Sequence, residues 1–255
     1  MKKLVITFMA LFLIAVQLNA QKTTLKVMSI NMKESGMMID YDIEPFCDFI
    51  RSENPDFVAL QEVQYKTSKI SGRDMVTEMA SALGMFPLFG RSISYYGGSA
   101  GVALLSKYPF FRSSSIIMDV TGQKFPRSCS FVDIKLPNNQ IVRLGATHLD
   151  HSTDQVRVSM MAKVNNAMLN DHLPSLLIGD FNTSPDSETM QYAKIKWDDL
   201  GYGTANTFPY PEATSRIDYV LGYPVNKWKS TMYRVVNENV SFSDHCPLIV
   251  ELEYE

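Results

Sequence analysis

The stretch Ser175-Leu-Leu-Ile-Gly-Asp-Phe-Asn182 is the clearest indication of how this chain folds. A short apolar run bounded by turn residues is typical of a buried strand. After this run a carboxylate and a carboxamide stand two positions apart, at Asp180 and Asn182. Gly179 has no Cβ, so backbone or substrate can approach it closely. An Asx turn that simply closes a strand explains the pattern equally well, so the rest of the chain has to decide between a turn and a site.

Several other apolar runs end in the same way. Apolar runs and alternation predict strands over residues 24–30, 56–60, 86–90, 101–106, 116–120, 128–136, 140–147, 216–220, 229–235 and 247–252. Helical spacing predicts helices over residues 43–50, 74–83, 154–169 and 187–193. Residues 97–99 and 200–215 are predicted as loops because of their glycines and prolines. Helices and strands interleave early and strands pair as hairpins later, which favours an α/β fold of mixed sheets covered by helices.

Eight polar residues end these apolar runs or lie near their ends. Alone, each has a simple structural explanation: a turn, a solvated carboxylate, a core histidine, or a pair between Asp218 and Arg216. One shared site explains all of them better, because ligands gather at the carboxyl ends of strands in α/β sheets. The eight residues are Asn31, Glu62, His148, Asp180, Asn182, Asp218, Asp244 and His245.

The chemistry of this set points to phosphate esters. Carboxylates and amides without thiolates are hard oxygen ligands, which suit Mg²⁺, Mn²⁺ or Ca²⁺ better than zinc. A histidine beside an aspartate is equipped for acid–base work or for donating to a phosphoryl oxygen. The chain has neither a Gly-rich phosphate loop nor a G-x-S-x-G motif, so neither an NTPase nor a serine hydrolase is indicated.

Length and composition describe one globular domain behind a signal peptide. The chain has 255 residues, of which 45% are hydrophobic and 20% charged, with no visible linker. Lys2 and Lys3 precede a short apolar run that ends in a small residue, Ala20, the pattern of a secretory signal peptide. A retained membrane anchor is the alternative. We expect a signal peptide over residues 1–20, a catalytic domain over 21–255, and export to the periplasm or the medium without a membrane span in the mature chain.

Net charge and cysteine spacing limit the nucleic acid and metal partners that we expect for this chain. Without Lys2 and Lys3, the 24 basic residues become 22 against 27 acidic ones, a net charge of about −5, and no basic block is present. Tight binding of long nucleic acid is therefore not indicated, although nucleic acid stays possible because divalent cations would add positive charge. Cys47, Cys129 and Cys246 match no metal motif and are predicted to be small buried hydrophobes.

Six motifs resemble the endonuclease/exonuclease/phosphatase family, which includes DNase I-like nucleases, abasic-site endonucleases, inositol polyphosphate 5-phosphatases, neutral sphingomyelinases and deadenylases. The motifs occur in the family's order and span nearly all of the chain after the signal peptide. The resemblance implies a four-layer α/β sandwich, in which two packed mixed β-sheets are flanked by helices. The motifs are Leu60-Gln-Glu62-Val, Gly101-Val-Ala-Leu-Leu-Ser-Lys-Tyr-Pro109, Thr147-His148-Leu, Gly179-Asp-Phe-Asn182, Arg216-Ile-Asp218-Tyr and Ser243-Asp-His245-Cys-Pro.

The resemblance also implies a metal and the residues beside it. Glu62 would be the principal ligand of Mg²⁺ or Mn²⁺. Asn31 would lie beside the metal and the phosphate, and Asp244 would lie near the metal side of the site. Thr207-Phe-Pro ahead of Arg216 is similar to bacterial metal-dependent hydrolases of this family.

The catalytic roles are likewise implied by the resemblance. Asp180 would position or deprotonate the attacking water, and Asn182 would contact the phosphate and hold that water. His245 would donate to the phosphate, oriented by Asp218. His148 would contact a phosphoryl oxygen.

The expected function is metal-dependent hydrolysis of a phosphomonoester or phosphodiester. Arg127 is a candidate phosphate contact, with a solvated arginine at a strand start as the alternative. A secreted nuclease, a sphingomyelinase-like phospholipid phosphodiesterase and a non-catalytic binding protein on the same fold remain as alternatives. The sequence has no long basic insertion and no membrane-binding hairpin, which favours a small or accessible phosphoester. We expect a monomer.

Overall fold

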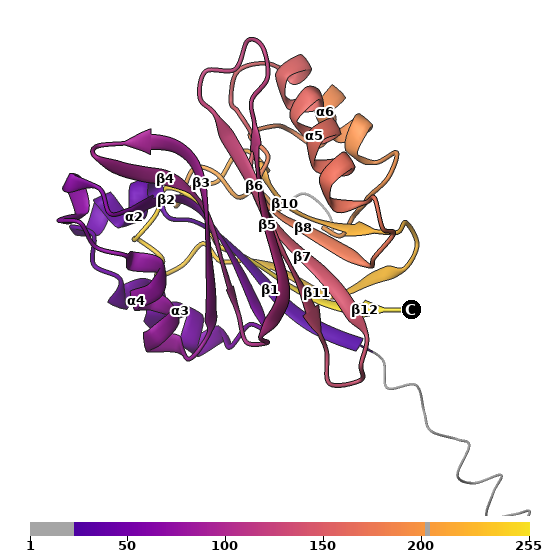
Figure 1. Ribbon diagram of the computed structural model, residues 1–255, viewed down its shortest axis with the longest axis horizontal. Helices are drawn as coiled ribbons and strands as arrows, with labels where there is room; N and C mark the ends of the chain where they lie inside the picture. Colours follow the sequence, from indigo (N-terminus) through magenta and orange to yellow (C-terminus); the bar gives the residue numbers. More distant parts are fainter. Residues whose placement is uncertain (1–22, 202–204) are drawn as a thin grey trace, which may run out of the picture.

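The computed structural model describes residues 23–201 and 205–255 and contains two six-stranded sheets (Figure 1). The predicted signal peptide, residues 1–20, lies outside the described residues. One sheet has the order β11-β12-β1-β2-β4-β3 and contains β1 (Thr23–Asn31), β2 (Phe57–Tyr65), β3 (Phe86–Tyr95), β4 (Gly98–Ser106), β11 (Trp228–Val235) and β12 (Leu248–Tyr254). The other has the order β5-β6-β7-β8-β10-β9 and contains β5 (Phe110–Met118), β6 (Arg127–Lys135), β7 (Ile141–His148), β8 (Ser175–Asp180), β9 (Asp198–Asp199) and β10 (Asp218–Tyr223).

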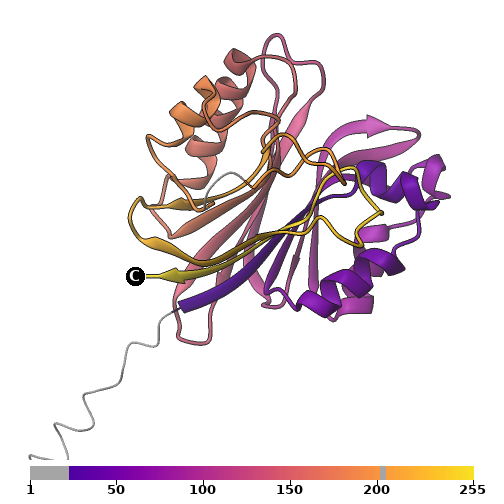
Figure 2. The same cartoon turned by 180° about the vertical axis from the view of Figure 1, so that it is seen from behind.

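Helices cover the outer face of each sheet (Figure 1, Figure 2). The first sheet packs against α3 (Glu44–Glu53) and α4 (Met75–Leu83), and the second against α5 (Asp154–Met168) and α6 (Glu188–Ala193). Shorter helical turns are α2 (Lys33–Gly36), η1 (Met37–Ile39) and η2 (Ser68–Ile70). No helix in the described part of the chain has the length and apolar character needed to cross a membrane.

The layers follow from the alternation of side chains along the strands. In β8, Leu176 and Ile178 face the other sheet, whereas Leu177 between them faces the helices. In β1, Val27 points into the inter-sheet core and Met28 points toward α3 and α4. Successive residues of a strand point to opposite faces, so a continuously apolar strand must be covered on both sides. The four-layer sandwich of two mixed sheets is confirmed.

The Met-rich face of the longest helix belongs to the core. Met160, Met161, Val164 and Met168 of α5 are fully buried against the second sheet. The side chain of Thr153 caps the start of this helix by accepting from the backbone N–H of Val156.

Some boundaries differ from the sequence prediction. Residues 98–99 belong to β4 and not to a loop, because Tyr96 and Gly97, with φ of 41° and 76°, form a two-residue hairpin turn after β3. The strand predicted from Arg216 begins at Asp218, and the short strand β9 was not predicted. Within the predicted 200–215 loop, residues 202–204 lie outside the described part.

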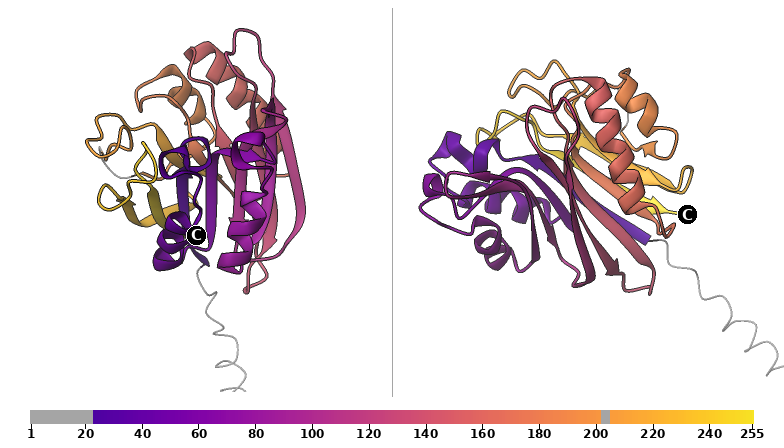
Figure 3. Two further views of the ribbon diagram at one scale, coloured as in Figure 1. Left: turned by 90° about the vertical axis from the view of Figure 1, so that its left-hand side faces the viewer. Right: turned by 45° about the horizontal axis from the view of Figure 1, so that its top comes forward.

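Parallel pairs bring the polar strand ends to one edge of the sandwich. β1 and β2 run parallel, as do β7 and β8, while the other neighbours are antiparallel. Asn31 is level with Gln61, and His148 is level with Asp180. The first and last strands, β1 and β12, lie side by side (Figure 3).

Candidate active site

The end of β8 positions two of the predicted residues. Asp180 closes β8 and is 1% exposed, and Asn182 follows with a φ of 50°. Gly179 has a φ of +153°, and a Cβ there would meet the carbonyl oxygen of Thr147 at 1.9 Å. The close approach expected at Gly179 is therefore that of the neighbouring strand β7. The backbone N–H of Asn182 donates to Asp180 Oδ1 at 2.8 Å, so the turn also orients the carboxylate.

The parallel strand β7 brings His148 beside Asp180. Arg127 Nη1 lies 3.0 Å from His148 Nδ1, and because arginine can only donate, Nδ1 accepts. The ring proton is therefore on Nε2, which lies 3.4 Å from the Asp180 Oδ2 acceptor. Burial, together with the charges of Arg127 and His245, lowers the pKa of His148 well below its usual range, so this ring is neutral.

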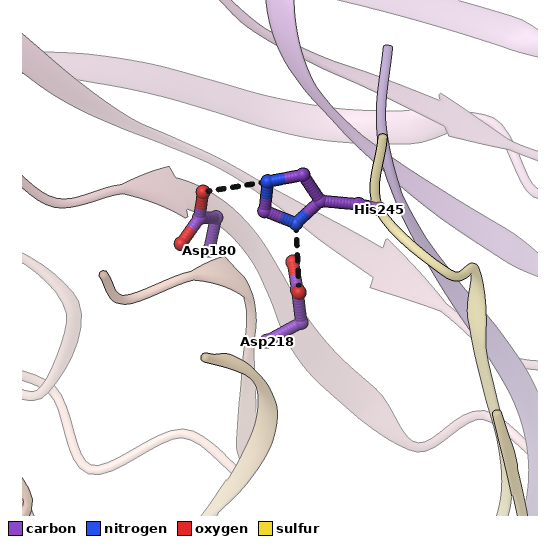
Figure 4. Close-up of side chains that lie close together, drawn as sticks. All are labelled: Asp180, Asp218 and His245. Carbon is purple, nitrogen blue, oxygen red and sulfur yellow. Dashed lines mark hydrogen bonds and ion pairs between the residues drawn. The ribbon is translucent and has the colours of Figure 1, made fainter. Parts of the chain in front are cut away.

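Asp180, Asp218 and His245 form a compact cluster (Figure 4). Asp218 opens β10 directly opposite Asp180 in the ladder. His245 Nδ1 donates to Asp218 Oδ2 at 3.0 Å, and its Nε2 lies 3.8 Å from Asp180 Oδ2. Ser243 holds the histidine in place, because its Oγ donates to the Asn31 carbonyl at 2.6 Å and accepts from the His245 N–H at 3.1 Å.

Asn31 joins the two sheets at the site. Its Nδ2 lies 3.2 Å from Asp180 Oδ2 and 3.4 Å from Glu62 Oε1, while its Oδ1 accepts from the Lys33 N–H at 3.0 Å. Glu62 does not end its strand as expected: β2 continues beyond it, and Glu62 lies in a bulge with a φ of 57°. Bulges redirect side chains, and here the Glu62 Oε2 accepts from the Glu34 N–H at 3.0 Å.

The electrostatics of the cluster pair a base with an acid. Burial and the neighbouring Asp218 carboxylate raise the pKa of Asp180 to about 7. Burial opposes the charge on His245, but the attraction of Asp218, its hydrogen bond and the Asp180 carboxylate raise the pKa of His245 to about 9. Near neutral pH the cluster therefore holds a carboxylate poised to take a proton beside a protonated imidazole.

The donor set fits a hard divalent cation. Asp180, Asp218 and His245 each offer a ligand atom within 4.8 Å of one another, and Glu62 adds a carboxylate beyond Asn31. A protonated imidazole has no lone pair for a metal, so the oxygens are the fitting ligands and His245 is not. Oxygen ligands without thiolates suit Mg²⁺ or Mn²⁺. The raised pKa of Asp180 agrees, because it comes from burial and from the neighbouring Asp218 carboxylate, and a bound cation would counter both by stabilising the charged form.

Two predicted residues lie at the edges of this cluster. Arg127, whose side chain is 16% exposed, contacts His148, and its Nε lies 3.9 Å from Asp150 Oδ2. Asp244 pairs with Lys33, whose Nζ lies 2.8 Å from Asp244 Oδ2. The structure therefore brings Asp244 to the rim of the site, where its charge is balanced by a lysine that the sequence analysis did not single out.

Several supporting residues were not assigned a role from the sequence. Thr207 Oγ1 accepts from the backbone N–H groups of Ile217 and Asp218, at 3.1 and 3.2 Å, and so holds the start of β10. The ring of Phe208 lies 4.8 Å from that of His245. Arg216 bonds Asp199, not Asp218, so the simple pairing considered for Asp218 is wrong. Only the Thr207-Phe-Pro motif offered a signal, because these contacts join distant segments.

The three cysteines are buried, as predicted, and none of them forms a disulfide. Burial raises the pKa of Cys47 and Cys246 to about 11 and that of Cys129 to about 12. A thiol with such a pKa is protonated at neutral pH and is a poor nucleophile. Cys246 therefore takes no part in the chemistry, although it follows His245.

Solved structures with the same fold are numerous, and three illustrate the range. An endonuclease/exonuclease/phosphatase from Bacteroides vulgatus is 18% identical, with a TM-score of 0.74 over 92% of this chain and 100% of that one. A mannosyl-6-phosphatase from Bacteroides thetaiotaomicron VPI-5482 is 20% identical, with a TM-score of 0.72 over 89% of this chain and 99% of that one. ANGEL2, a 2′,3′-cyclic phosphatase, is 11% identical, with a TM-score of 0.74 over 91% and 95%.

At such identities, these structures establish a shared fold. No curated protein matches the sequence. The model of the endonuclease/exonuclease/phosphatase family matches residues 28–245, which include Asn31, Glu62 and every other strand-end residue that meets at the site. On that match, the chain belongs to the endonuclease/exonuclease/phosphatase family.

Proposed function

We propose that the protein hydrolyses a phosphate ester through attack of water on phosphorus, in a reaction that requires a divalent cation. The observation that carries the proposal is a convergence at one edge of the sandwich: Glu62 and Asp180 both contact the Asn31 amide, and His245 lies beside Asp180. Phosphoryl transfer depends on positioning and on charge stabilisation more than on covalent chemistry. This edge supplies groups that can position the substrate and groups that can stabilise its charge.

Asp180 is the proposed base for the attacking water. Its pKa of about 7 lies near neutral pH, where a general base with such a pKa is effective. His245 is the proposed donor to a phosphoryl oxygen through Nε2, because Asp218 holds its Nδ1 and keeps the ring protonated. The remaining donors, on Asn182, His148 and Arg127, would contact the other phosphoryl oxygens.

Glu62 would hold the cation, with Asn31 and Asp180 beside it. Bound Mg²⁺ or Mn²⁺ would neutralise charge on the phosphoryl group. Lys33 is proposed to keep the rim of the site neutral by pairing with Asp244, because the hydrogen bond to this carboxylate raises the pKa of Lys33. Asp244 would then act beside the metal site without ligating the metal directly.

The test measures hydrolysis of p-nitrophenyl phosphate and bis-p-nitrophenyl phosphate. EDTA should abolish turnover, and excess Mg²⁺ or Mn²⁺ should restore it. His245→Ala should lower kcat by about 10³-fold, since it removes a donor to the developing charge. Turnover that survives both EDTA and His245→Ala would contradict the proposal.

The substrate can be a monoester or a diester, and the alternatives differ in the product. A nuclease would nick plasmid DNA, and a sphingomyelinase-like enzyme would release a phosphorylated headgroup from a phospholipid. The name of the mannosyl-6-phosphatase of the same fold adds sugar phosphates to the substrates to be tested. A non-catalytic binding protein is disfavoured, because all the residues of the family's motifs are present.

Export and a monomeric state complete the proposal. Cleavage near Ala20 is proposed from the apolar run behind Lys2 and Lys3. Mass spectrometry of the protein secreted by an expressing cell tests the cleavage, and an intact Met1 in the exported protein would contradict it. Light scattering in solution tests the monomer.

A further inference from the structure

A cavity of about 320 Å³ opens on one side of the proposed active site. It shares Glu62, His148 and Arg127 with that site and extends between the two sheets to Ser92 and Gly101. Within the described residues, Asp180, Asp218 and His245 do not line it. The cavity therefore lies on the Glu62 side of the phosphoryl position, away from the proposed base.

This placement identifies the part of the substrate that would occupy the cavity. In phosphoryl transfer the attacking and leaving oxygens lie roughly in line on opposite sides of phosphorus. If Asp180 holds the attacking water, the leaving oxygen points away from Asp180. The leaving alcohol would then enter the cavity beside Glu62 and His148.

One wall of the cavity is aromatic and is held in place. Phe125 is 50% exposed, its ring lies 5.8 Å from that of His151, and both line the cavity. The buried Asp150 carboxylate accepts from the backbone N–H groups of Lys124 and Phe125 at 3.3 and 3.0 Å, and from that of Ser152 at 2.9 Å. An apolar ring kept at the surface by this buried anchor is a preformed stacking face.

Another part of the cavity lining is polar. Glu34 and Tyr95 line it, and Glu34 Oε2 accepts from Tyr95 OH at 2.9 Å and from Lys69 Nζ at 2.8 Å. Glu34 is therefore held in an ion pair with Lys69. The backbone presents Glu34 in a left-handed turn, with positive φ from Lys33 to Gly36. Such backbone strain is typical of functional sites.

We propose that this cavity binds a neutral, polyhydroxylated ring, so that the substrate is the phosphate monoester of a sugar. The inference rests on the proposed phosphoesterase function. One aromatic face can stack on the apolar side of a sugar ring, while carboxylate, phenol and serine oxygens bind its hydroxyls. A volume of about 320 Å³ is at the small end of ligand cavities. Lys69 and Lys33 already pair with Glu34 and Asp244, so neither lysine is available to balance a second phosphate, which disfavours a nucleic acid chain or a bisphosphate.

The first experiment compares substrates. Hexose 6-phosphates, glycerol phosphate, nucleoside monophosphates, a dinucleotide, hexose 1,6-bisphosphate and phosphorylcholine lipids are assayed beside p-nitrophenyl phosphate. The highest kcat/KM is expected for a hexose monophosphate. If p-nitrophenyl phosphate is hydrolysed and the dinucleotide, nucleotide or lipid is preferred to every hexose phosphate, the sugar proposal fails while the phosphoesterase proposal stands.

The second experiment removes the stacking ring. Phe125→Ala should raise KM for the preferred hexose phosphate by roughly five- to tenfold with kcat little changed, the size of one aromatic contact. The inhibition constant of inorganic phosphate, which fills only the phosphoryl position, should be unchanged. Phe111→Ala is the matched control, because Phe111 is 59% exposed on β5 and does not line the cavity. An equal effect of Phe125→Ala on phosphate inhibition would overturn the inference.

The third experiment tests charge selection and adds a binding measurement that does not depend on turnover. Glu34→Gln should raise the kcat/KM of hexose 1,6-bisphosphate relative to the monophosphate by roughly fivefold, whereas the exposed Glu44→Gln should leave the ratio unchanged. Calorimetry with the Asp180→Asn variant measures hexose phosphate binding directly. If Phe125→Ala weakens hexose phosphate binding in that background, the sugar-binding proposal is supported even when no ester is hydrolysed. If neither Phe125→Ala nor Glu34→Gln changes that binding, the proposal is overturned.

Discussion

Two buried arginines, Arg143 and Arg127, lie near opposite ends of the paired strands β6 and β7. They differ in how many of their N–H donors are hydrogen-bonded within the protein. At one end, Arg143 uses all five of its donors: two bonds to Asp133, two to Asp171 and one to the Met168 carbonyl, at 2.7–2.9 Å. Its side chain is 2% exposed. A buried charge with every donor satisfied is a structural element of the fold.

At the other end, the hydrogen bonding of Arg127 is incomplete. It contacts the neutral His148, its Nε finds no hydrogen-bond partner in the described part of the chain, and Asp150 is 3.9 Å away. Burial lowers the pKa of Arg127, whereas the bonds of Arg143 to Asp133 and Asp171 outweigh burial and raise its pKa. Unsatisfied buried donors cost stability, and the phosphate of the proposed substrate would supply the missing partner. The contrast separates an arginine whose donors are all bonded within the fold from one that has a donor left for the proposed phosphoryl contact.

The largest effect is expected at Asp180, the proposed base, which lies at the same end of the strands as Arg127. Asp180→Asn should lower kcat/KM by about 10³- to 10⁴-fold, because the amide cannot accept a proton. The free energy of unfolding should not fall, because the wild-type carboxylate is buried beside Asp218. Steady-state kinetics and urea unfolding measure the two effects. Asp186→Asn, at an exposed carboxylate after the same strand, is the control, and a similar loss there would contradict the assignment.

The second effect is expected at Arg143, whose donors are all hydrogen-bonded. Arg143→Met should lower the free energy of unfolding by about 3–5 kcal/mol, because it leaves the buried Asp133 without its partner. The kcat of the protein that remains folded should be preserved. Arg112→Met is the matched control: Arg112 reaches the same carboxylates at 3.4 Å from a 59% exposed position and should contribute at most about 1 kcal/mol. Equal losses of stability in both variants would remove the distinction.

The third effect tests the incomplete arginine itself. Arg127→Met should lower kcat/KM by about 10²-fold, the size of one lost donor to a phosphoryl oxygen. It should change the free energy of unfolding by less than about 1 kcal/mol, since few protein bonds are lost. Arg127→Lys should recover part of the activity, because the charge returns without the forked geometry. A loss of stability as large as that of Arg143→Met would show Arg127 to be structural.

The smallest effect is a pH dependence of stability in EDTA. The pKa of Asp180 is raised to about 7 in the folded state, so the folded state holds this proton longer than the unfolded state. Stability should therefore fall as the pH rises from about 4 to 7, with the penalty complete above that range. His245, with its charge 3.8 Å away, offsets part of this penalty. Asp180→Asn should remove the fall, and urea titrations from pH 4 to 8 that show the same slope in both proteins would contradict the shift.

Much of the fold and of the site could be predicted, because both depend on the local pattern of apolar and polar residues along the chain. The apolar run before Gly179 and the Met-rich face of residues 154–168 show periods that only one kind of element can satisfy. The polar residues that follow such runs had to lie at strand ends, and parallel strands bring these ends together. The bulge at Glu62 and the short strand β9 escaped prediction, because they depend on the partner strands and not on their own sequence.

The sequence by itself determined the two apolar faces of each sheet, the buried cysteines and the family motifs, since these depend on residue type and spacing alone. Only the tertiary structure decided which charges are balanced: Arg143 meets Asp133 and Asp171, Lys33 meets Asp244, and Arg127 stays incomplete. It also decided that a cavity walled by Phe125 and Glu34 lies beside the site. Coulomb and hydrogen-bond energies depend on distance in space, and residues far apart in the chain carry no record of that distance in their spacing.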